Sequence, residues 1–233
     1  MVAFDVETVT VDSYTTLVDV DSQEAVLREY VDGIGDDAAA VSGLWRSQTI
    51  QYTMVANDVD AYRPFYDLLG LGLSYALESH GYDVPEAVRD EIRREVYVER
   101  LAVFEDVRSG IERIAEAGYP VYIVSNGDPE MLGHLVDAAG VEGVVEDAIS
   151  ADEVETYKPD AEIYRHAAAR TGTPIGKVLH ASGGTMRDVW GAKHAGMHAA
   201  WMNRPEKGAP RERLGADPDL VVSDFEDLAD RLA

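Results

Sequence analysis

The chain has 233 residues, of which 46% are hydrophobic, which suffices for one large α/β domain or a domain with an insertion. It carries 44 acidic against 20 basic residues, a formal net charge of −24, and it contains no cysteine. These values argue against a nucleic-acid binder, which needs basic patches. They also exclude disulfides, zinc–thiolate sites and thiol nucleophiles.

No apolar run is as long as a membrane span, and the N-terminal segment lacks the basic-then-apolar pattern of a signal peptide. We therefore expect a soluble, cytoplasmic protein with no membrane partner. A surface rich in acids and poor in lysine is typical of proteins that work in concentrated salt, where self-repulsion is screened. The composition thus favours a halophilic protein, and an ordinary acidic soluble protein is the alternative.

Hydrophobic periodicity predicts two kinds of segment in chain order. A strand over residues 6–12 is followed by a helical block, in which Asp21 and Ser22 are expected to cap the first helix. The expected helices of this block span residues 22–30, 38–55, 61–79 and 85–98, with a helix break at Gly70-Leu71-Gly72. Beyond residue 100, helices are expected at 107–117, 129–139, 160–171, 187–195 and 224–232, and strands at 121–124, 177–181, 199–202 and 220–222.

Alternating strands and helices indicate an α/β fold with a Rossmann-like parallel sheet covered on both faces. The helical block that follows the first strand is typical of an inserted helical cap domain. We assign residues 1–20 and 101–233 to the core and 21–100 to the cap. The active site is expected between them, and the apolar face of the cap would also fit a homodimer.

Polar residues stand at the ends of several expected core strands, where ligands bind in open parallel sheets. They are Asp12, Ser125-Asn126, Lys158-Pro159 and Asp188. Each has an ordinary alternative, since Asp12 and Asp188 are good cap residues and Ser125-Asn126-Gly127 is a good turn. Asp5 is a rival to Asp12 as a nucleophile, but it lacks the turn of small hydroxyl residues that follows Asp12.

In combination and order, these segments resemble the motifs of the haloacid dehalogenase superfamily and, within it, the (S)-2-haloacid dehalogenases. The resemblance covers nearly the whole chain. Its four motifs are matched by residues 12–17 (DSYTTL), 125–127 (SNG), 157–160 (YKPD, with Tyr164 beyond) and 181–188 (ASGGTMRD). Leu44-Trp45-Arg46 is similar to the cap helix that carries the halide-binding arginine of that family.

The resemblance implies hydrolytic dehalogenation of short-chain (S)-2-haloalkanoic acids to (R)-2-hydroxy acids, with the haloacid and the halide ion as small-molecule partners. Asp12 would attack the substrate carbon and form an ester. Lys158 would keep Asp12 ionised. Water would then attack the ester, positioned by Thr16 and activated by Asp188.

The remaining site residues are assigned to substrate and halide. Ser125 and backbone amides near Ser13 and Tyr14 would hold the substrate carboxylate, and Arg46 with Asn126 would receive the halide. An apolar wall of Tyr14, Ile50 and Phe65 would surround the side group of the substrate. The substrate-binding assignments are Ser13, Tyr14, Ile50, Phe65, Tyr164, Thr185 and Arg187.

Phosphatases of the superfamily carry a second Asp two residues after the nucleophile, as general acid and part of a Mg²⁺ site, and here that position is Tyr14. We therefore expect no cofactor and no catalytic metal. The six histidines also lack metal-ligand spacing of the HExxH kind. Two alternatives stay open: a Mg-dependent small-molecule phosphatase, and a catalytically impaired binding protein on this scaffold.

Several residues depart from the usual pattern, and those at Gly183, Thr185 and Arg187 motivate the second alternative. Thr15 stands where glycine is common, and Gly183 and Thr185 stand where Ser and Asn are usual. Arg187 replaces an aromatic residue and could instead anchor a second anion.

Overall fold

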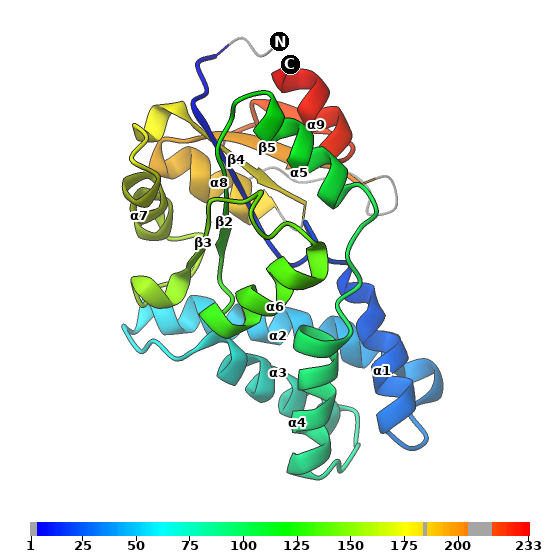
Figure 1. The fold of residues 1–233 in the computed structure, drawn as a ribbon. Helices are drawn as coiled ribbons and strands as arrows, with labels where there is room; N and C mark the ends of the chain where they lie inside the picture. Colours follow the sequence, from blue (N-terminus) through cyan, green and yellow to red (C-terminus); the bar gives the residue numbers. More distant parts are fainter. Residues whose placement is uncertain (1–3, 184–185, 205–215) are drawn as a thin grey trace. The chain divides into compact units, whose positions relative to one another are not determined.

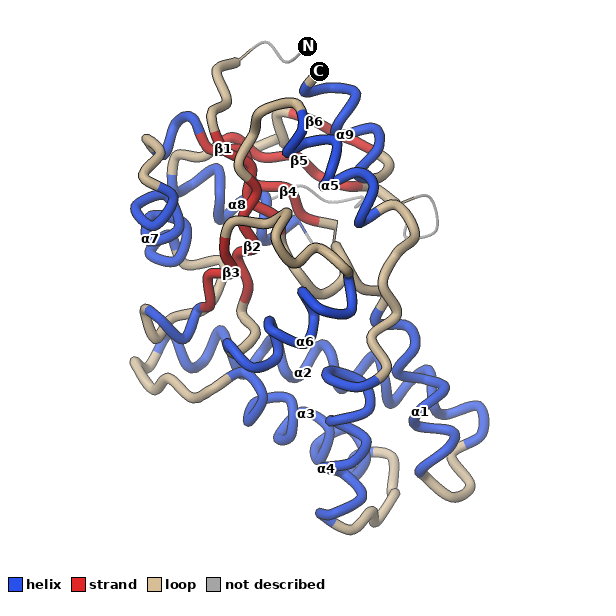
Figure 2. Tube along the Cα trace, in the orientation of Figure 1, coloured by secondary structure: helices blue, strands red, loops and turns tan. Residues whose placement is uncertain are grey.

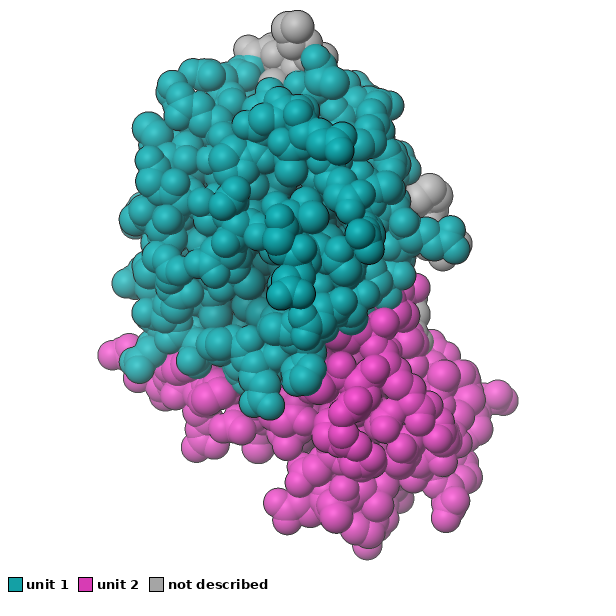
Figure 3. All heavy atoms as spheres, viewed as in Figure 1, with its two compact units in different colours: residues 1–18, 103–233 teal, residues 19–102 magenta. Residues whose placement is uncertain are grey.

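The computed structural model describes residues 4–183, 186–204 and 216–233, without the side chains of Asp21 and Met186. The chain folds as two compact units (Figure 3). One comprises residues 1–18 and 103–233, and the other comprises residues 19–102. Their junctions lie two residues from the predicted domain boundaries of 20/21 and 100/101.

The first unit is built on a six-stranded parallel sheet of order β3-β2-β1-β4-β5-β6. The strands are β1 (Thr8–Val11), β2 (Val121–Ser125), β3 (Asp147–Ser150), β4 (Val178–Ser182), β5 (His198–Met202) and β6 (Leu220–Val222). All four residues of β1 are buried and all four are β-branched, as expected of a central strand covered on both faces. The parallel α/β fold inferred from the sequence is thus confirmed.

Helices cover both faces of this sheet (Figures 1 and 2). They are α5 (Val107–Glu116), α6 (Pro129–Ala139), α7 (Ala161–Thr171), α8 (Met186–Ala195) and α9 (Phe225–Leu232). Helix α5 packs on α9, and α7 packs on α8. Each predicted helix of this unit is present with its ends shifted by at most about two residues, which is the usual uncertainty of helix ends.

The second unit is helical. It contains α1 (Gln23–Tyr30), α2 (Ala38–Asp58), α3 (Phe65–Ser79) and α4 (Glu86–Arg94), which continues into a π-helical turn (Glu95–Glu99). Its core includes Trp45, which is fully buried and donates from Nε1 to the backbone oxygen of Leu69. The two long helices α2 and α3 pack closely along their length.

Two local predictions are wrong in this unit. Gly70-Leu71-Gly72 does not break a helix but lies inside α3. A Cβ at Gly72 would lie 2.3 Å from Thr49 Oγ1, so glycine serves close packing of α3 on α2 rather than a turn. Ser22 does not cap α1 with its side chain, because its hydroxyl donates back to the Asp19 carbonyl.

Strand β3 was not expected from the sequence. It has four residues, lies at the edge of the sheet and begins with the exposed Asp147. Short edge strands of this kind lack the apolar alternation that identifies a strand.

Candidate active site

The carboxyl ends of β1, β2 and β4 lie at one edge of the sheet. Val11 pairs in register with Ile123 of β2 and with Ala181 of β4, and the Asp12 amide donates to the Ala181 carbonyl. Asp12 and Ser182 directly follow the paired residues Val11 and Ala181, and Ser125 is the last residue of β2. These three residues therefore lie at the same edge, as the topology predicts.

Lys158 joins two carboxylates at this edge and forms with them what we call the charge triad: Asp12, Lys158 and Asp188. Lys158 Nζ lies 2.8 Å from Asp12 Oδ1 and 3.0 Å from Asp188 Oδ2. The side chains are 2%, 12% and 16% exposed for Lys158, Asp12 and Asp188. The triad is therefore nearly dry and carries one negative charge in excess when all three groups are ionised. Asp5 takes no part in it, since its exposed side chain pairs with Lys177.

Burial and charge move the three pKa values in different directions. Burial raises the pKa of Asp12 above its ordinary value, and Lys158, although it opposes this, does not cancel it. Burial alone would raise the pKa of Asp188, but Lys158, His180 and Arg187 together outweigh it and the pKa of Asp188 is lowered. The carboxylates in turn raise the pKa of Lys158 against its desolvation. Lys158 thus acts on Asp12 in the expected direction, but burial and the neighbouring Asp188 carboxylate keep the pKa of Asp12 above its ordinary value.

The turn after Asp12 (residues 13–18, the Asp12 turn) fixes the second carboxylate oxygen. Thr16 Oγ1 donates to Asp12 Oδ2 at 2.7 Å and accepts the Gly183 amide at 2.8 Å. The Leu17 amide donates to the Ser13 carbonyl at 2.7 Å. Thr15 has a left-handed backbone, with φ 73°, which is strained for a β-branched residue. The Thr16 hydroxyl, expected to position water, is here engaged by Asp12.

A chain of hydroxyl groups lies beside this turn. Ser13 Oγ and Ser125 Oγ are 2.5 Å apart, and Ser125 Oγ also accepts the Gly127 amide at 2.9 Å. Ser150 Oγ donates to the Gly127 carbonyl at 2.7 Å, and the Asn126 side-chain oxygen accepts the Lys158 amide at 2.9 Å. Asn126, expected at the halide, thus holds the backbone of Lys158 in this structure.

Tyr164 contacts Asp188 from within the core, and His180 packs on the Tyr164 ring. Tyr164 is fully buried and donates from its hydroxyl to the Asp188 carbonyl at 3.2 Å. Its ring lies edge-on to His180, whose Nδ1 lies 2.9 Å from Thr10 Oγ1. Burial lowers the pKa of His180 to about 3, so this ring is neutral. His180 and Ser150 could not be selected from the sequence, because a lone polar residue in a strand has no distinctive spacing.

Comparison with known proteins decides the family. Residues 6–196 match the model of the haloacid dehalogenase-like hydrolases. The chain is 33% identical to (S)-2-haloacid dehalogenase 4A of Burkholderia cepacia, covering 95% of this chain and 93% of the relative. The chain belongs to the haloacid dehalogenase-like hydrolase family. It is also 28% identical to (S)-2-haloacid dehalogenase H-109 of Pseudomonas putida, covering 97% of this chain and 98% of the relative.

Solved structures of this family have the same fold. A crystal structure of an L-2-haloacid dehalogenase shares 30% identity at a TM-score of 0.90, covering 98% of this chain and 99% of the other. The L-2-haloacid dehalogenase of Xanthobacter autotrophicus, solved with chloropropionic acid covalently bound, shares 26% identity at a TM-score of 0.86, covering 97% of each chain. The resemblance drawn from the four motifs is confirmed.

The other residues assigned from this family resemblance are distributed over both units. Arg46, Ile50 and Phe65 belong to the helical unit, where Arg46 Nη1 lies 3.2 Å from Ser42 Oγ. Arg187 is half-buried at the start of α8, and desolvation lowers its pKa. Thr185 lies outside the described residues.

Among the described residues, no group of three or more His, Asp or Glu side chains is arranged to hold a metal ion. Nor does the part of the chain that the structure describes contain a helix able to span a lipid bilayer.

Proposed function

We propose that this protein is a hydrolase that converts short-chain (S)-2-haloalkanoic acids to (R)-2-hydroxy acids through an ester on Asp12, without a metal. The charge triad supports the proposal best. Lys158 Nζ lies within hydrogen-bond distance of both carboxylates, in the space that a cation bridging Asp12 and Asp188 would need. Tyr14, which stands where phosphatases of this superfamily carry a second carboxylate, argues in the same direction.

In the first step, an Asp12 oxygen attacks the substrate Cα from the side opposite the halogen. A carbon–oxygen bond forms, and the halide leaves with the electrons of the carbon–halogen bond, which inverts the configuration. The lysine, at 2.8 Å from Oδ1, and the Thr16 hydroxyl, at 2.7 Å from Oδ2, hold the carboxylate in a fixed orientation. Exclusion of bulk water would replace its hydration by these two donors.

In the second step, water attacks the ester carbonyl of Asp12 rather than the substrate carbon. Asp188 accepts a proton from this water, and the 2-hydroxy acid leaves with its alkoxide oxygen protonated, which regenerates the Asp12 carboxylate. The lowered pKa of Asp188 keeps this base ionised. Tyr164, which donates to the Asp188 carbonyl, would fix the position of the base.

Substrate and halide would be bound by groups from both units. The amides of Ser13, Tyr14 and Ser125 would bind the carboxylate, while Arg46 and Asn126 would bind the departing halide. The side group of the substrate would contact an apolar wall of Tyr14, Ile50 and Phe65. Tyr164, Thr185 and Arg187 complete the proposed substrate-binding set.

The helical unit also carries the surface best suited to a homodimer. Its exposed large apolar residues are Met54, Val55, Val59, Leu71 and Tyr75. They lie on α2, at its C-terminal end and on α3, and these two helices pack together. An exposed apolar surface of this kind favours association. Sedimentation equilibrium would test this proposal against a monomer.

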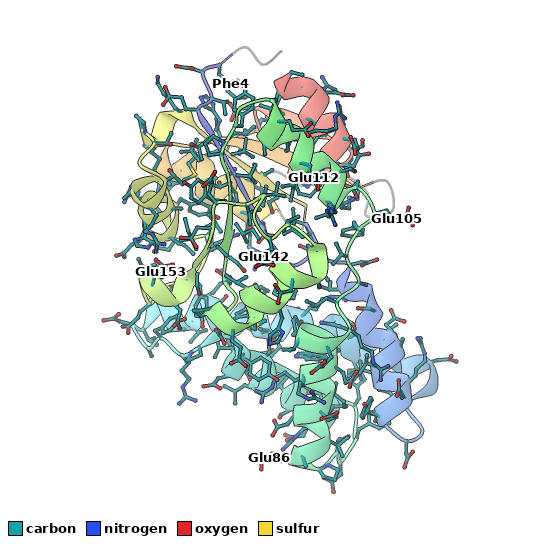
Figure 4. The ribbon with its side chains drawn as sticks, in the orientation of Figure 1. Phe4, Glu86, Glu105, Glu112, Glu142 and Glu153 are labelled. Atoms are coloured by element: carbon teal, nitrogen blue, oxygen red, sulfur yellow. The ribbon has the colours of Figure 1, made fainter. Side chains whose placement is uncertain are left out.

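We also propose that the protein works in the cytoplasm of a salt-adapted cell. The support is the net charge of −24 and the wide distribution of the acids, of which Glu86, Glu105 and Glu142 are exposed (Figure 4). The mutual repulsion of so many negative charges weakens as dissolved salt screens it. Thermal unfolding in low and high KCl tests the proposal, which requires stability to increase with salt.

A single turnover in ¹⁸O-water tests the ester. With enzyme in excess over (S)-2-chloropropionate, we expect ¹⁸O in the peptide that contains Asp12 and unlabelled oxygen in the product. Label in the product alone would mean that water attacks the substrate carbon directly. A parallel reaction in EDTA should proceed at the same rate, whereas phosphate-ester hydrolysis restored by Mg²⁺ would favour a phosphatase.

A further inference from the structure

Arg204 lies outside the four motifs, yet it contacts the backbone of the Asp12 turn. It follows β5 and is only 8% exposed. Its Nη2 donates to the Thr16 carbonyl at 2.9 Å. The hydroxyl of the same Thr16 donates to Asp12 Oδ2, so Thr16 links Arg204 to the Asp12 carboxylate.

The rest of the Arg204 guanidinium is fixed on the segment that leads into α5. Nη1 and Nη2 bind the two Asp106 oxygens at 2.8 and 3.2 Å, and the guanidinium lies 3.7 Å above the centre of the Phe104 ring. Asp106 also accepts the Phe225 amide at 2.9 Å, at the start of α9. This bidentate, stacked arrangement is specific to arginine.

Arg204 therefore connects two chain segments that already run together. The Phe104 amide donates to the Leu17 carbonyl, and Val18 and Val103 form an antiparallel bridge. These segments are the two by which the first unit continues into the second, since the junctions lie at 18/19 and 102/103. Arg204 joins one of them through the Thr16 carbonyl and the other through Phe104 and Asp106.

The turn that Arg204 holds is one that needs support. Thr15 is a β-branched residue at φ 73°, a conformation that costs on the order of 1–3 kcal/mol and persists only where surrounding contacts fix it. The Arg204 bond to the next carbonyl is such a contact, and the Gly183 amide bond to Thr16 Oγ1 is another.

We infer that Arg204 is a positioning residue for the reaction: through Thr16 it fixes the Asp12 carboxylate in the orientation required for attack on carbon. The inference rests on the proposed function for its kinetic effect. A displacement of about 1 Å at a reacting group reduces a rate by about 100-fold, so a loosened Asp12 turn should affect kcat much more than KM.

The test compares Arg204→Gln and Arg204→Lys with Arg113→Gln. Arg113 is the control for the loss of an arginine with two carboxylate contacts, because it pairs with Glu226 and Asp230 between α5 and α9, although it is more exposed than Arg204. For ester formation in a single turnover, we expect a 10- to 100-fold slower rate in Arg204→Gln, a smaller loss in Arg204→Lys and a change within about twofold in Arg113→Gln. KM should stay within about twofold in all three.

A double-mutant cycle with Thr16→Val separates positioning from general destabilisation. If Arg204 acts through Thr16, adding Arg204→Gln to Thr16→Val costs less than about twofold, because the contact to Asp12 is already lost. If the rate losses of Thr16→Val and Arg204→Gln instead multiply in the double variant, the inference is wrong. It is also wrong if a folded Arg204→Gln variant forms the ester at the wild-type rate. Should Arg204→Gln not fold, Arg204→Lys carries the same cycle.

Hydrogen exchange gives a readout that does not need turnover. The amides of Leu17 and Gly183 should lose protection in Arg204→Lys and keep it in Arg113→Gln. Unchanged protection would overturn the inference even where the wild-type enzyme is active. Absence of halide release by the wild type would instead contradict the proposed function and leave the exchange result to decide on Arg204.

Discussion

Replacement of Lys158 by Met should destabilise the protein more than any other lysine substitution in its described part. Met removes the cation of the charge triad at nearly constant volume and leaves two carboxylates without a counter-ion. Each of these carboxylates is at most 16% exposed, so water cannot replace the lost ammonium group. The variant therefore tests whether the triad is the buried, coupled site that its geometry indicates.

The expected loss follows from the two contacts, at 2.8 and 3.0 Å. At an effective dielectric constant of about 20, each such attraction is worth on the order of 6 kcal/mol before desolvation is deducted. Removing one partner from a buried pair costs about 3–5 kcal/mol in practice. We expect a loss of this size in the free energy of unfolding for Lys158→Met at pH 8.

The sign of the pH dependence is fixed by the same argument. Without Lys158, burial and mutual repulsion hold the pKa values of both carboxyls above the ordinary value in the folded state. A group with a raised folded pKa gains stability as it binds a proton, so the loss is full at high pH and shrinks as the pH falls through these values. Urea unfolding of both proteins between pH 5 and pH 8 measures it.

Lys193→Met is the matched control. Lys193 binds both oxygens of Asp219 at 2.8 Å, but at 22% and 20% exposure the pair is more accessible to water. We expect about 1 kcal/mol or less for this substitution. A Lys158→Met loss no larger than that of the control, or a loss that is equal at pH 5 and pH 8, would refute the reasoning.

Three further predictions concern other groups of the same unit. Asp12→Asn should abolish halide release but raise the free energy of unfolding by roughly 1 kcal/mol, because burial disfavours the charge that catalysis needs; urea unfolding measures this, and lower stability would contradict it. Gly183→Ser should cost about 1–3 kcal/mol and slow turnover, since a Cβ there would lie 2.9 Å from the Thr15 carbonyl, and Thr15→Gly should restore part of both in thermal melts and halide assays. Asp106→Asn should cost about 1–3 kcal/mol at pH 7. Burial alone would raise the pKa of Asp106, but Arg204 and the Phe225 amide lower it, so the stabilisation is present above the ordinary pKa of 3.8 and disappears as the pH falls through the lowered value. Acid unfolding curves of the two proteins measure this difference.

The order of elements could be predicted because it depends on local patterns. Buried strands such as Val121–Ser125 are short apolar runs, and helices such as Pro129–Ala139 begin at a proline and have an apolar face. Edge strand β3 has no such pattern. The glycines of α3 were misinterpreted for a related reason, because close packing against Thr49 is a tertiary effect that propensity does not contain.

The members of the site could be predicted, but not all of their contacts. Asp12, Lys158 and Asp188 follow from strand ends and motif order, and the structure brings them together. That Asn126 binds the Lys158 amide depends on rotamers and loop paths, which sequence spacing does not determine. Arg204 stayed unnoticed because its partners lie at positions 16, 104 and 106, far from it in sequence and without a common period.

The departures from the family pattern are easier to understand in pairs than singly. Thr15, where glycine is common, takes up φ 73° and points its carbonyl at residue 183. A side chain at residue 183 would meet that carbonyl at 2.9 Å, whereas glycine leaves room and still donates its amide to Thr16. With this backbone, glycine at residue 183 avoids the Thr15 carbonyl and preserves the bond from Thr16 to Asp12. For this reason we interpret Gly183 as part of a working site rather than as a sign of its loss.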